Sequence, residues 1–280
     1  MVALRFHVER DINLFCHTVA LFPESFRSEG SAFSNPSYRR DHLRLRTKPL
    51  VDQFSRLVPL GWGDWDFVGL SLLGGDSGVG SIERRLRGRS NLLTDVWSAI
   101  LAESWKGYGG LWPEVQDHLS RYRFRLETDW DSIGIVTLER LRRISRADWN
   151  PEHVDVYLVD CLYGAASYMN TILIAPVADM EIEKKLLCHE LSESAFAGSS
   201  LLARLERNGI DPSVAHTIVD TAAYFALRPW LKPEYVDRLK PKASYYPKAE
   251  SVYMAFERCE GLSGGYPELD ELLGLIKAAL

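Results

Sequence analysis

Cysteine is scarce in this chain, and its four cysteines are too far apart to suggest a shared site. Cys16, Cys161, Cys188 and Cys259 include no C-x-x-C pair. This spacing provides neither the disulfide framework of a small secreted domain nor the paired ligands of a structural zinc ribbon. We therefore expect an intracellular, cytoplasmic protein whose thiols stay reduced.

The chain also lacks a surplus of basic charge. It has 33 Lys and Arg residues against 38 Asp and Glu residues, which gives a formal net charge of −5. Proteins that bind nucleic acid mainly through its phosphates need a basic surface. The local basic runs, such as residues 139–146, are interrupted by apolar residues and are typical of solvated helix faces. We expect no nucleic-acid partner.

Long apolar runs are missing as well. No stretch reaches the roughly 18 uncharged apolar residues that a membrane-spanning helix requires. Charges at Arg5, Glu9, Arg10 and Asp11 interrupt the apolar segment that a signal peptide would have near the N-terminus. These features predict no membrane partner.

The composition of the chain is that of an ordinary globular protein. Its 280 residues are 46% hydrophobic and 25% charged, which allows one large domain or two moderate ones. Apolar residues three and four apart, as in residues 91–105, predict a mainly helical region over residues 1–150. The pattern changes near residue 151, and we expect residues 151–280 to form a second region with strands followed by helices.

Strands are predicted mainly in the middle of the chain. Residues 153–160 alternate apolar and other side chains, and residues 167–176 form a second apolar run that ends at Pro176. We expect these two strands to lie side by side and antiparallel, while residues 2–8 could form a third, short strand. The fold class predicted is therefore α+β, predominantly helical with a small, mostly antiparallel sheet.

Helical periodicity dominates the rest of the second region. Its helices are expected over residues 180–197, 199–208, 212–227, 233–240, 247–260 and 267–279.

The first of these helices contains the sequence "CHELSES", in which His189 and Glu193 are four residues apart. Residues four apart share a helix face, so both side chains could bind one ion, with Glu190 beside them to hold a water. The helix is apolar on two sides, which is typical of a buried helix. Because buried carboxylates cost several kcal/mol unless a cation or hydrogen bonds compensate them, a divalent metal would explain their presence.

The run "YMNTILIAPVADMEIEKKLLCHELSESAF" resembles the edge strand and active-site helix of the gluzincin-type zinc metallopeptidases. The resemblance implies a zincin-like fold around this helix, with His189 as the first zinc ligand and Glu190 as the general base. It also implies that the strand at residues 168–175 holds an extended peptide or protein substrate. The sequence departs from the family motif H-E-x-x-H at Glu193, which stands in place of the second histidine.

The helix expected next in the chain offers candidates for a third ligand. His216, Asp220 and Tyr224 are spaced by four residues and line the side opposite its apolar face. Either Asp220 or His216 could complete the metal site. Tyr224 or His216 could donate a hydrogen bond to a developing oxyanion.

A glycine-rich segment at residues 75–81 resembles a phosphate-binding loop in the spacing of its glycines. The lysine and hydroxyl that such a loop needs are replaced by Ser81 and Ile82, so a flexible turn is the better interpretation.

Three functions follow in order of preference. The first is a zinc-dependent hydrolase, a peptidase or a relative of one, that uses a metal-activated water. The second is a catalytically inactive zincin-like protein with a binding or regulatory role, favoured by the glutamate at position 193. The third is a nucleotide-binding protein that uses the glycine-rich segment.

Overall fold

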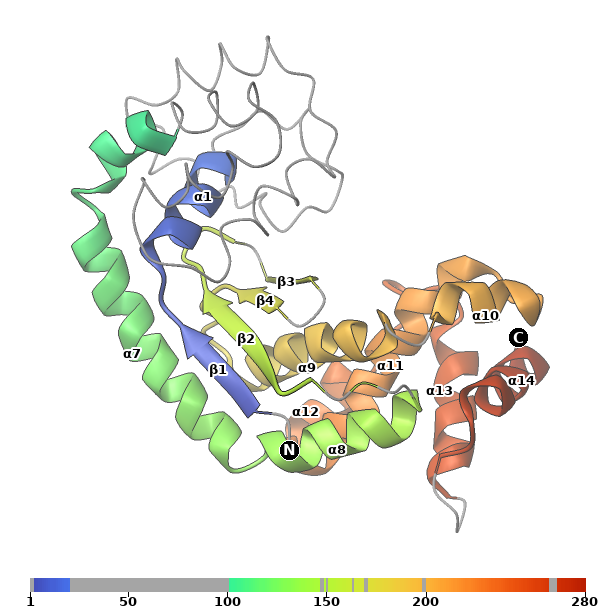
Figure 1. Ribbon diagram of the computed structural model, residues 1–280. Helices are drawn as coiled ribbons and strands as arrows, with labels where there is room; N and C mark the ends of the chain where they lie inside the picture. The colour runs from blue at the N-terminus through green and yellow to red at the C-terminus, as the bar shows by residue number, and fades with distance from the viewer. Residues whose placement is uncertain are drawn as a thin grey trace, which may run out of the picture.

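The computed structural model describes residues 3–20, 101–146, 149, 151–162, 164–168, 171–197, 200–261 and 266–280 (Figure 1). The glycine-rich segment at 75–81 lies outside the described residues, and so does the rest of residues 21–100, within the helical region expected over residues 1–150. The division of the chain near residue 150 stays a prediction.

In the described part of the chain, four short strands form one sheet in the order β1-β2-β4-β3. They are β1 (Ala3–His7), β2 (His153–Leu158), β3 (Ala165–Tyr168) and β4 (Thr171–Ile174). The pairs β1–β2 and β2–β4 are parallel, and only β3–β4 is antiparallel. The sheet is therefore mixed, and the prediction of a mostly antiparallel sheet was wrong.

The error comes from residues 167–176, which were predicted to be one strand. They contain the end of β3 and all of β4, two antiparallel neighbours. Strand β4 lies between β2 and β3, so β2 and β3, which follow each other in the chain, are not neighbours in the sheet. The edge strand on this side is therefore β3, and most of the segment 168–175 expected at the edge lies inside the sheet.

The alternation predicted for the strand after residue 153 is confirmed only over its first part, because Tyr157 and Val159 are buried as well. Val154, Val156 and Leu158 of β2 are fully buried, whereas Asp155 is half-buried and accepts a hydrogen bond from His7 of β1 at 2.7 Å. The short N-terminal strand, β1, is also confirmed, and its partner lies about 150 residues further along the chain.

Helices make up most of the remaining described chain, so the α+β class with a predominance of helix is confirmed. None of the described helices is both long and apolar enough to cross a membrane. The helices are α1 (Arg10–Ala20), α7 (Trp112–Asp131), α8 (Gly134–Ser145), α9 (Met180–Ala197), α10 (Leu201–Arg207), α11 (Ala215–Leu227), α12 (Pro233–Leu239), α13 (Ala249–Glu260) and α14 (Leu269–Ala279).

Helix α9 is central to the described part of the fold. It packs against β3 and β4 on one side and against α8 and α11 on the other, while α7 runs along β1 (Figure 1). Leu187, Leu191 and Ala195 are fully buried on it, as expected for a helix that is apolar on two sides. Because α9 is surrounded by the sheet and other helices, several of its polar side chains are buried too, among them Glu183 and Lys185.

Helices α9 and α11 approach each other closely because α11 is rich in small residues. Ala222, Ala223 and Ala226 are fully buried, and the Cys188 thiol donates a hydrogen bond to the Ala223 carbonyl at 3.3 Å. Beyond them, Phe225 packs on Phe256 of α13, with ring centroids 5.6 Å apart. This contact between α9 and α11 brings together the candidate site residues of both helices.

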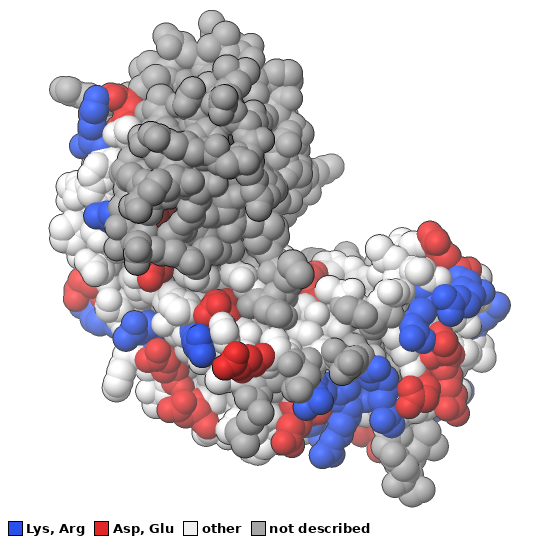
Figure 2. All heavy atoms as spheres, in the orientation of Figure 1, with Lys and Arg blue, Asp and Glu red and all other residues white. Residues whose placement is uncertain are grey.

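On the face of the molecule in Figure 2, acidic and basic side chains are interspersed over the described surface. Neither sign of charge covers that face.

Candidate metal centre

The start of α9 is determined by a capping carboxylate. Asp179 Oδ1 accepts hydrogen bonds from the backbone N–H groups of Glu181 at 3.1 Å and Ile182 at 3.4 Å, which satisfies donors that a helix leaves free. Asp179 Oδ2 in turn accepts a hydrogen bond from the Tyr235 hydroxyl at 2.8 Å. With its first turn anchored to α12, the helix presents His189 and Glu193 on the side that faces α11.

The start of α11 is determined in a similar way. The Asp211 side chain accepts a hydrogen bond from the backbone N–H of Ser213 at 2.9 Å, and Pro212 occupies the first position of a short 3₁₀ turn. The α-helix then begins at Ala215, so that His216 lies in its first turn, opposite the last turns of α9.

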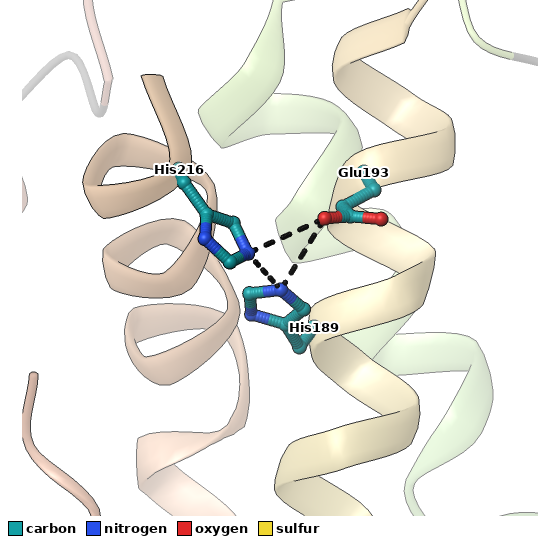
Figure 3. A group of neighbouring side chains, drawn as sticks. All are labelled: His189, Glu193 and His216. Carbon is teal, nitrogen blue, oxygen red and sulfur yellow. Dashed lines mark hydrogen bonds and ion pairs between the residues drawn. The ribbon is translucent and has the colours of Figure 1, made fainter. Parts of the chain in front are cut away.

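His189 and Glu193 from α9 converge with His216 from α11 (Figure 3). Nε2 of His189 lies 2.8 Å from Nε2 of His216. Oε1 of Glu193 lies 3.5 Å from Nε2 of His189 and 3.4 Å from Nε2 of His216. Two imidazole nitrogens and one carboxylate oxygen thus form a small triangle of potential metal ligands.

The triangle has nearly the dimensions of one face of a tetrahedral zinc site. Zinc bonds of 2.0–2.1 Å place neighbouring ligand atoms about 3.3 Å apart. Both distances to Glu193 agree with this value, and the distance between the two imidazoles would have to grow by about half an ångström. The His216 side chain is 57% exposed, so solvent reaches the triangle and a fourth position could take water or substrate.

Asp220 lies behind this triangle and contacts His189 from the other side of its ring. Its Oδ1 accepts a hydrogen bond from Nδ1 of His189 at 2.8 Å, and it also pairs with Lys185. A carboxylate on Nδ1 fixes the proton there and leaves Nε2 free to bind a metal, an arrangement common around metal-bound histidines. Of the two candidates for a third ligand, the structure therefore places His216 in the triangle and Asp220 in a supporting position.

Contacts within this group shift the pKa values of its members, and a bound metal would have to displace the proton of His189. Burial lowers the pKa of His189, but hydrogen bonds to Asp220 and Glu193 outweigh it and raise that pKa to about 9. Burial opposes ionisation of Glu193, yet hydrogen bonds with His189, His216 and Ser167 hold its pKa far below the usual range. The Ser167 hydroxyl donates to Oε2 of Glu193 at 2.6 Å, which leaves Oε1 directed at the two histidines.

Glu190 is a buried carboxyl group next to the triangle. Burial and the negative charge of Glu193 raise its pKa to about 7, and its Oε2 has no hydrogen-bond partner among the described residues. A carboxylate whose pKa is close to neutral can both accept and return a proton at physiological pH. This is the property that a general base requires.

The charges around the triangle can be balanced in two ways. Without a metal, protonated His189 and Lys185 offset ionised Glu193 and Asp220, with Glu190 neutral. A divalent cation, with both histidines neutral and Glu190 ionised, would also give zero net charge. Metal binding would therefore replace the protons of His189 and Glu190.

Two residues of the site were missed by the sequence reasoning. Ser167 comes from the edge strand β3, and Tyr246 comes from the segment between α12 and α13, where its ring meets that of His216 edge-on at 5.5 Å. Burial and the charge of Asp220 raise the pKa of Tyr246 well above its usual range, so its hydroxyl stays protonated. Neither residue belongs to a motif or a periodic face that could have identified it.

Tyr224, the residue expected to stabilise an oxyanion, is placed elsewhere. It lies two turns beyond His216 on α11, is 1% exposed, and packs against Phe225 and Tyr253 with ring centroids 5.6 and 6.0 Å away. Burial and the adjacent Tyr253 raise its pKa to about 12. The structure thus brings together His189, Glu190, Glu193, His216 and Asp220, with Tyr224 in the core toward α13.

Comparison of the chain with protein-family models, with curated proteins and with solved structures gives no match.

Proposed function

We propose that this protein is a zinc-dependent hydrolase that cleaves peptide or protein substrates. The observation that carries the proposal is the triangle of His189, Glu193 and His216, supported by a carboxylate on His189 and flanked by the buried carboxyl group of Glu190. Three protein ligands and one open position are characteristic of catalytic zinc sites, whereas structural sites use four protein ligands.

The ligand set explains the departure from the zinc-peptidase motif. Two histidines and one glutamate hold zinc in known peptidases. In the gluzincin-type enzymes the second histidine lies on the motif helix and the acidic ligand on a later helix. Here Glu193 occupies the motif position and His216 the later helix, so the set is the same with two members exchanged. This exchange supports a relation to the gluzincin-type metallopeptidases as part of the proposal.

The residues around the ligands have distinct roles in the proposed reaction. A bound zinc ion would supply Lewis acidity to a carbonyl group and acidify a water molecule. Glu190 accepts the proton of the attacking water and returns it to the leaving amine, because its pKa lies near neutrality. Tyr246 packs its ring against His216 and its hydroxyl interacts with Asp220, so its role is to position these two side chains.

A peptide substrate has a strand available beside the site. Strand β3 pairs only with β4 among the described strands, and it packs against α9. An extended peptide could add to its outer edge by backbone hydrogen bonds. Ser167 of this strand already contacts Glu193, so a peptide bound there would pass close to the ligand triangle.

The proposal is tested by the metal content of the purified full-length chain. We expect one zinc per chain by mass spectrometry, and loss of that zinc in His189→Ala and His216→Ala. His118→Ala on the exposed surface of α7 is the matched control and should keep its zinc. Protein that is folded by circular dichroism but contains no zinc after incubation with the metal would refute the metal site.

The exchange of ligands provides a sharper test. The double variant Glu193→His with His216→Glu restores the usual order and keeps two imidazoles and one carboxylate. We expect it to bind zinc within about tenfold of the original chain, whereas His216→Ala alone should lose at least 100-fold in affinity. Equal loss in both variants would show that these two positions do not share one ion.

Catalysis is tested separately from metal binding. Glu190→Gln should retain zinc but lose hydrolysis of a mixed peptide library by at least 100-fold, since general bases contribute about that much or more. Hydrolysis that is unchanged in this variant would exclude Glu190 as the base.

An inactive binding protein is the second candidate, and one observation favours it. Glu193 is an anionic oxygen ligand that would make a bound water less acidic than an imidazole would. Stoichiometric zinc without hydrolysis of any library peptide would select this alternative.

A further inference from the structure

An apolar pocket of about 600 Å³ opens directly beside the ligand triangle. It lies between the last turn of α9, the start of α10 and the first turns of α11. Glu193 and His216, two of the three proposed ligands, form part of its wall. The other lining residues are mostly apolar, namely Phe196, Ala197, Ser200, Leu201, Leu202, Ala203, Ala215 and Val219.

The walls of the pocket are firmly held by the core. Phe196, Leu201 and Val219 are 3–6% exposed and belong to the main hydrophobic cluster, so this part of the wall is preformed. Leu202 at the mouth is 58% exposed, which leaves apolar surface uncovered next to the polar site. The volume falls within the range typical of small-molecule sites, which is large enough for an aromatic or long aliphatic side chain.

The charge of the lining limits what the pocket can accept. Neither Lys nor Arg is among the lining residues, and Glu193 contributes a negative charge at one end. An acidic group would enter without a partner and close to a carboxylate, which is unfavourable. A neutral apolar group would bury its surface against Phe196, Leu201 and Val219 at no such cost.

From this geometry we infer that the substrate carries a bulky, neutral, apolar side chain adjacent to the bond that is cleaved. That side chain occupies the pocket, while the reacting carbonyl lies at the ligand triangle. The two places adjoin, because Glu193 and His216 belong both to the pocket lining and to the triangle. The inference rests on the proposed hydrolase function, because the pocket determines specificity only if the ligand triangle holds a metal.

The test uses hydroxamates, which bind zinc directly, as probes of the zinc-loaded full-length chain. Acetohydroxamate reaches only the metal, 3-phenylpropionohydroxamate adds an apolar group, and succinyl monohydroxamate adds a carboxylate. By isothermal titration calorimetry we expect the phenyl compound to bind at least tenfold more tightly than acetohydroxamate, since burial of several carbons stabilises the complex. The carboxylate compound should gain nothing over acetohydroxamate.

Variants in the pocket separate its contribution from that of the metal. Ala203→Trp, at an exposed lining position, should remove the gain of the phenyl compound and leave the affinity for acetohydroxamate within twofold. Ala197→Trp, exposed on the α9 side, provides a second variant of the same kind. Ala278→Trp, at another exposed alanine, on α14 and outside the pocket lining, is the matched control and should change neither affinity.

The outcomes distinguish the two proposals. If zinc binds but the phenyl compound gains nothing, or keeps its gain in both tryptophan variants, the pocket inference is overturned while the metal site stands. Zinc-loaded protein that binds no hydroxamate also overturns it, because the pocket would not lead to the metal. Dimerisation that Ala203→Trp abolishes would assign the pocket to a second copy of the chain. Absence of zinc binding overturns the hydrolase function, and the inference with it.

Discussion

Replacement of Asp220 by asparagine removes one negative charge while keeping the size of the side chain. In the native chain Asp220 Oδ1 accepts from Nδ1 of His189 at 2.8 Å and pairs with Lys185, whose Nζ also donates to the Asp220 carbonyl at 3.1 Å. Asp220 is 5% exposed and Lys185 is 8% exposed. The variant therefore leaves the buried lysine without its counter-charge.

Two magnitudes follow from these contacts. Removal of one partner of a buried ion pair costs about 3–5 kcal/mol. In this variant the asparagine oxygen and the backbone carbonyl still accept hydrogen bonds from Lys185. We therefore expect the free energy of unfolding of the metal-free chain to fall by about 2–3 kcal/mol. Loss of the carboxylate behind a metal-bound histidine lowers metal affinity by about 10- to 100-fold. Asp220→Asn should therefore bind zinc within that range below the native affinity.

The assay combines urea unfolding of metal-free protein with competition for zinc against a chelator. Lys185→Met provides the partner for a double-mutant cycle, because the double variant leaves no unpaired charge. We expect the double variant to be at least about 1 kcal/mol more stable than the sum of the single effects predicts. A folded Asp220→Asn chain with native zinc affinity, or strictly additive stabilities, would refute the supporting position of Asp220.

Three further predictions concern protons and packing. Zinc binding near pH 7 should release about one proton, because His189, with a pKa of about 9, must lose its proton to bind the metal. Calorimetry in two buffers of different ionisation enthalpy measures this release. Identical binding heats in the two buffers would contradict the prediction. Since the folded pKa of His189 lies above the unfolded value of about 6.5, its contribution of up to about 3 kcal/mol is complete below pH 6.5 and is lost as the pH rises toward 9. Urea midpoints of metal-free protein should fall over that interval, and those of zinc-saturated protein should not follow the same curve. Phe256→Ala, in the core, should cost about 3–5 kcal/mol, whereas Phe124→Ala, 74% exposed, should cost less than about 0.5 kcal/mol in the same assay.

Features that depend on residues close together in the chain were predictable. The shared face of His189 and Glu193 follows from the helical repeat, and the burial of α9 follows from its two apolar sides. The alternation of β2 likewise identified Val154, Val156 and Leu158 as core residues, although it did not predict the burial of Tyr157. Each of these properties is encoded within a few residues, so that periodicity alone reveals it.

Strand order required the tertiary structure. Strand β1 pairs with β2 across about 150 residues. Residues 167–176 were expected to form one strand beside β2, but only β4 lies there. Short apolar strands can pair in several ways with similar local contacts, so the helices packed against the sheet select the pairing.

The choice of the third ligand depended on packing as well. His216 and Asp220 lie four residues apart on one face of α11, and local periodicity treats them alike. The close contact of Cys188 with Ala223 fixes how α11 lies along α9, which places His216 at the ligand triangle and Asp220 one turn behind it. Ser167 and Tyr246 reach the site from separate elements only because the chain is folded. Helical repeats specify which side chains share a face, whereas the contacts between distant segments determine which of them meet.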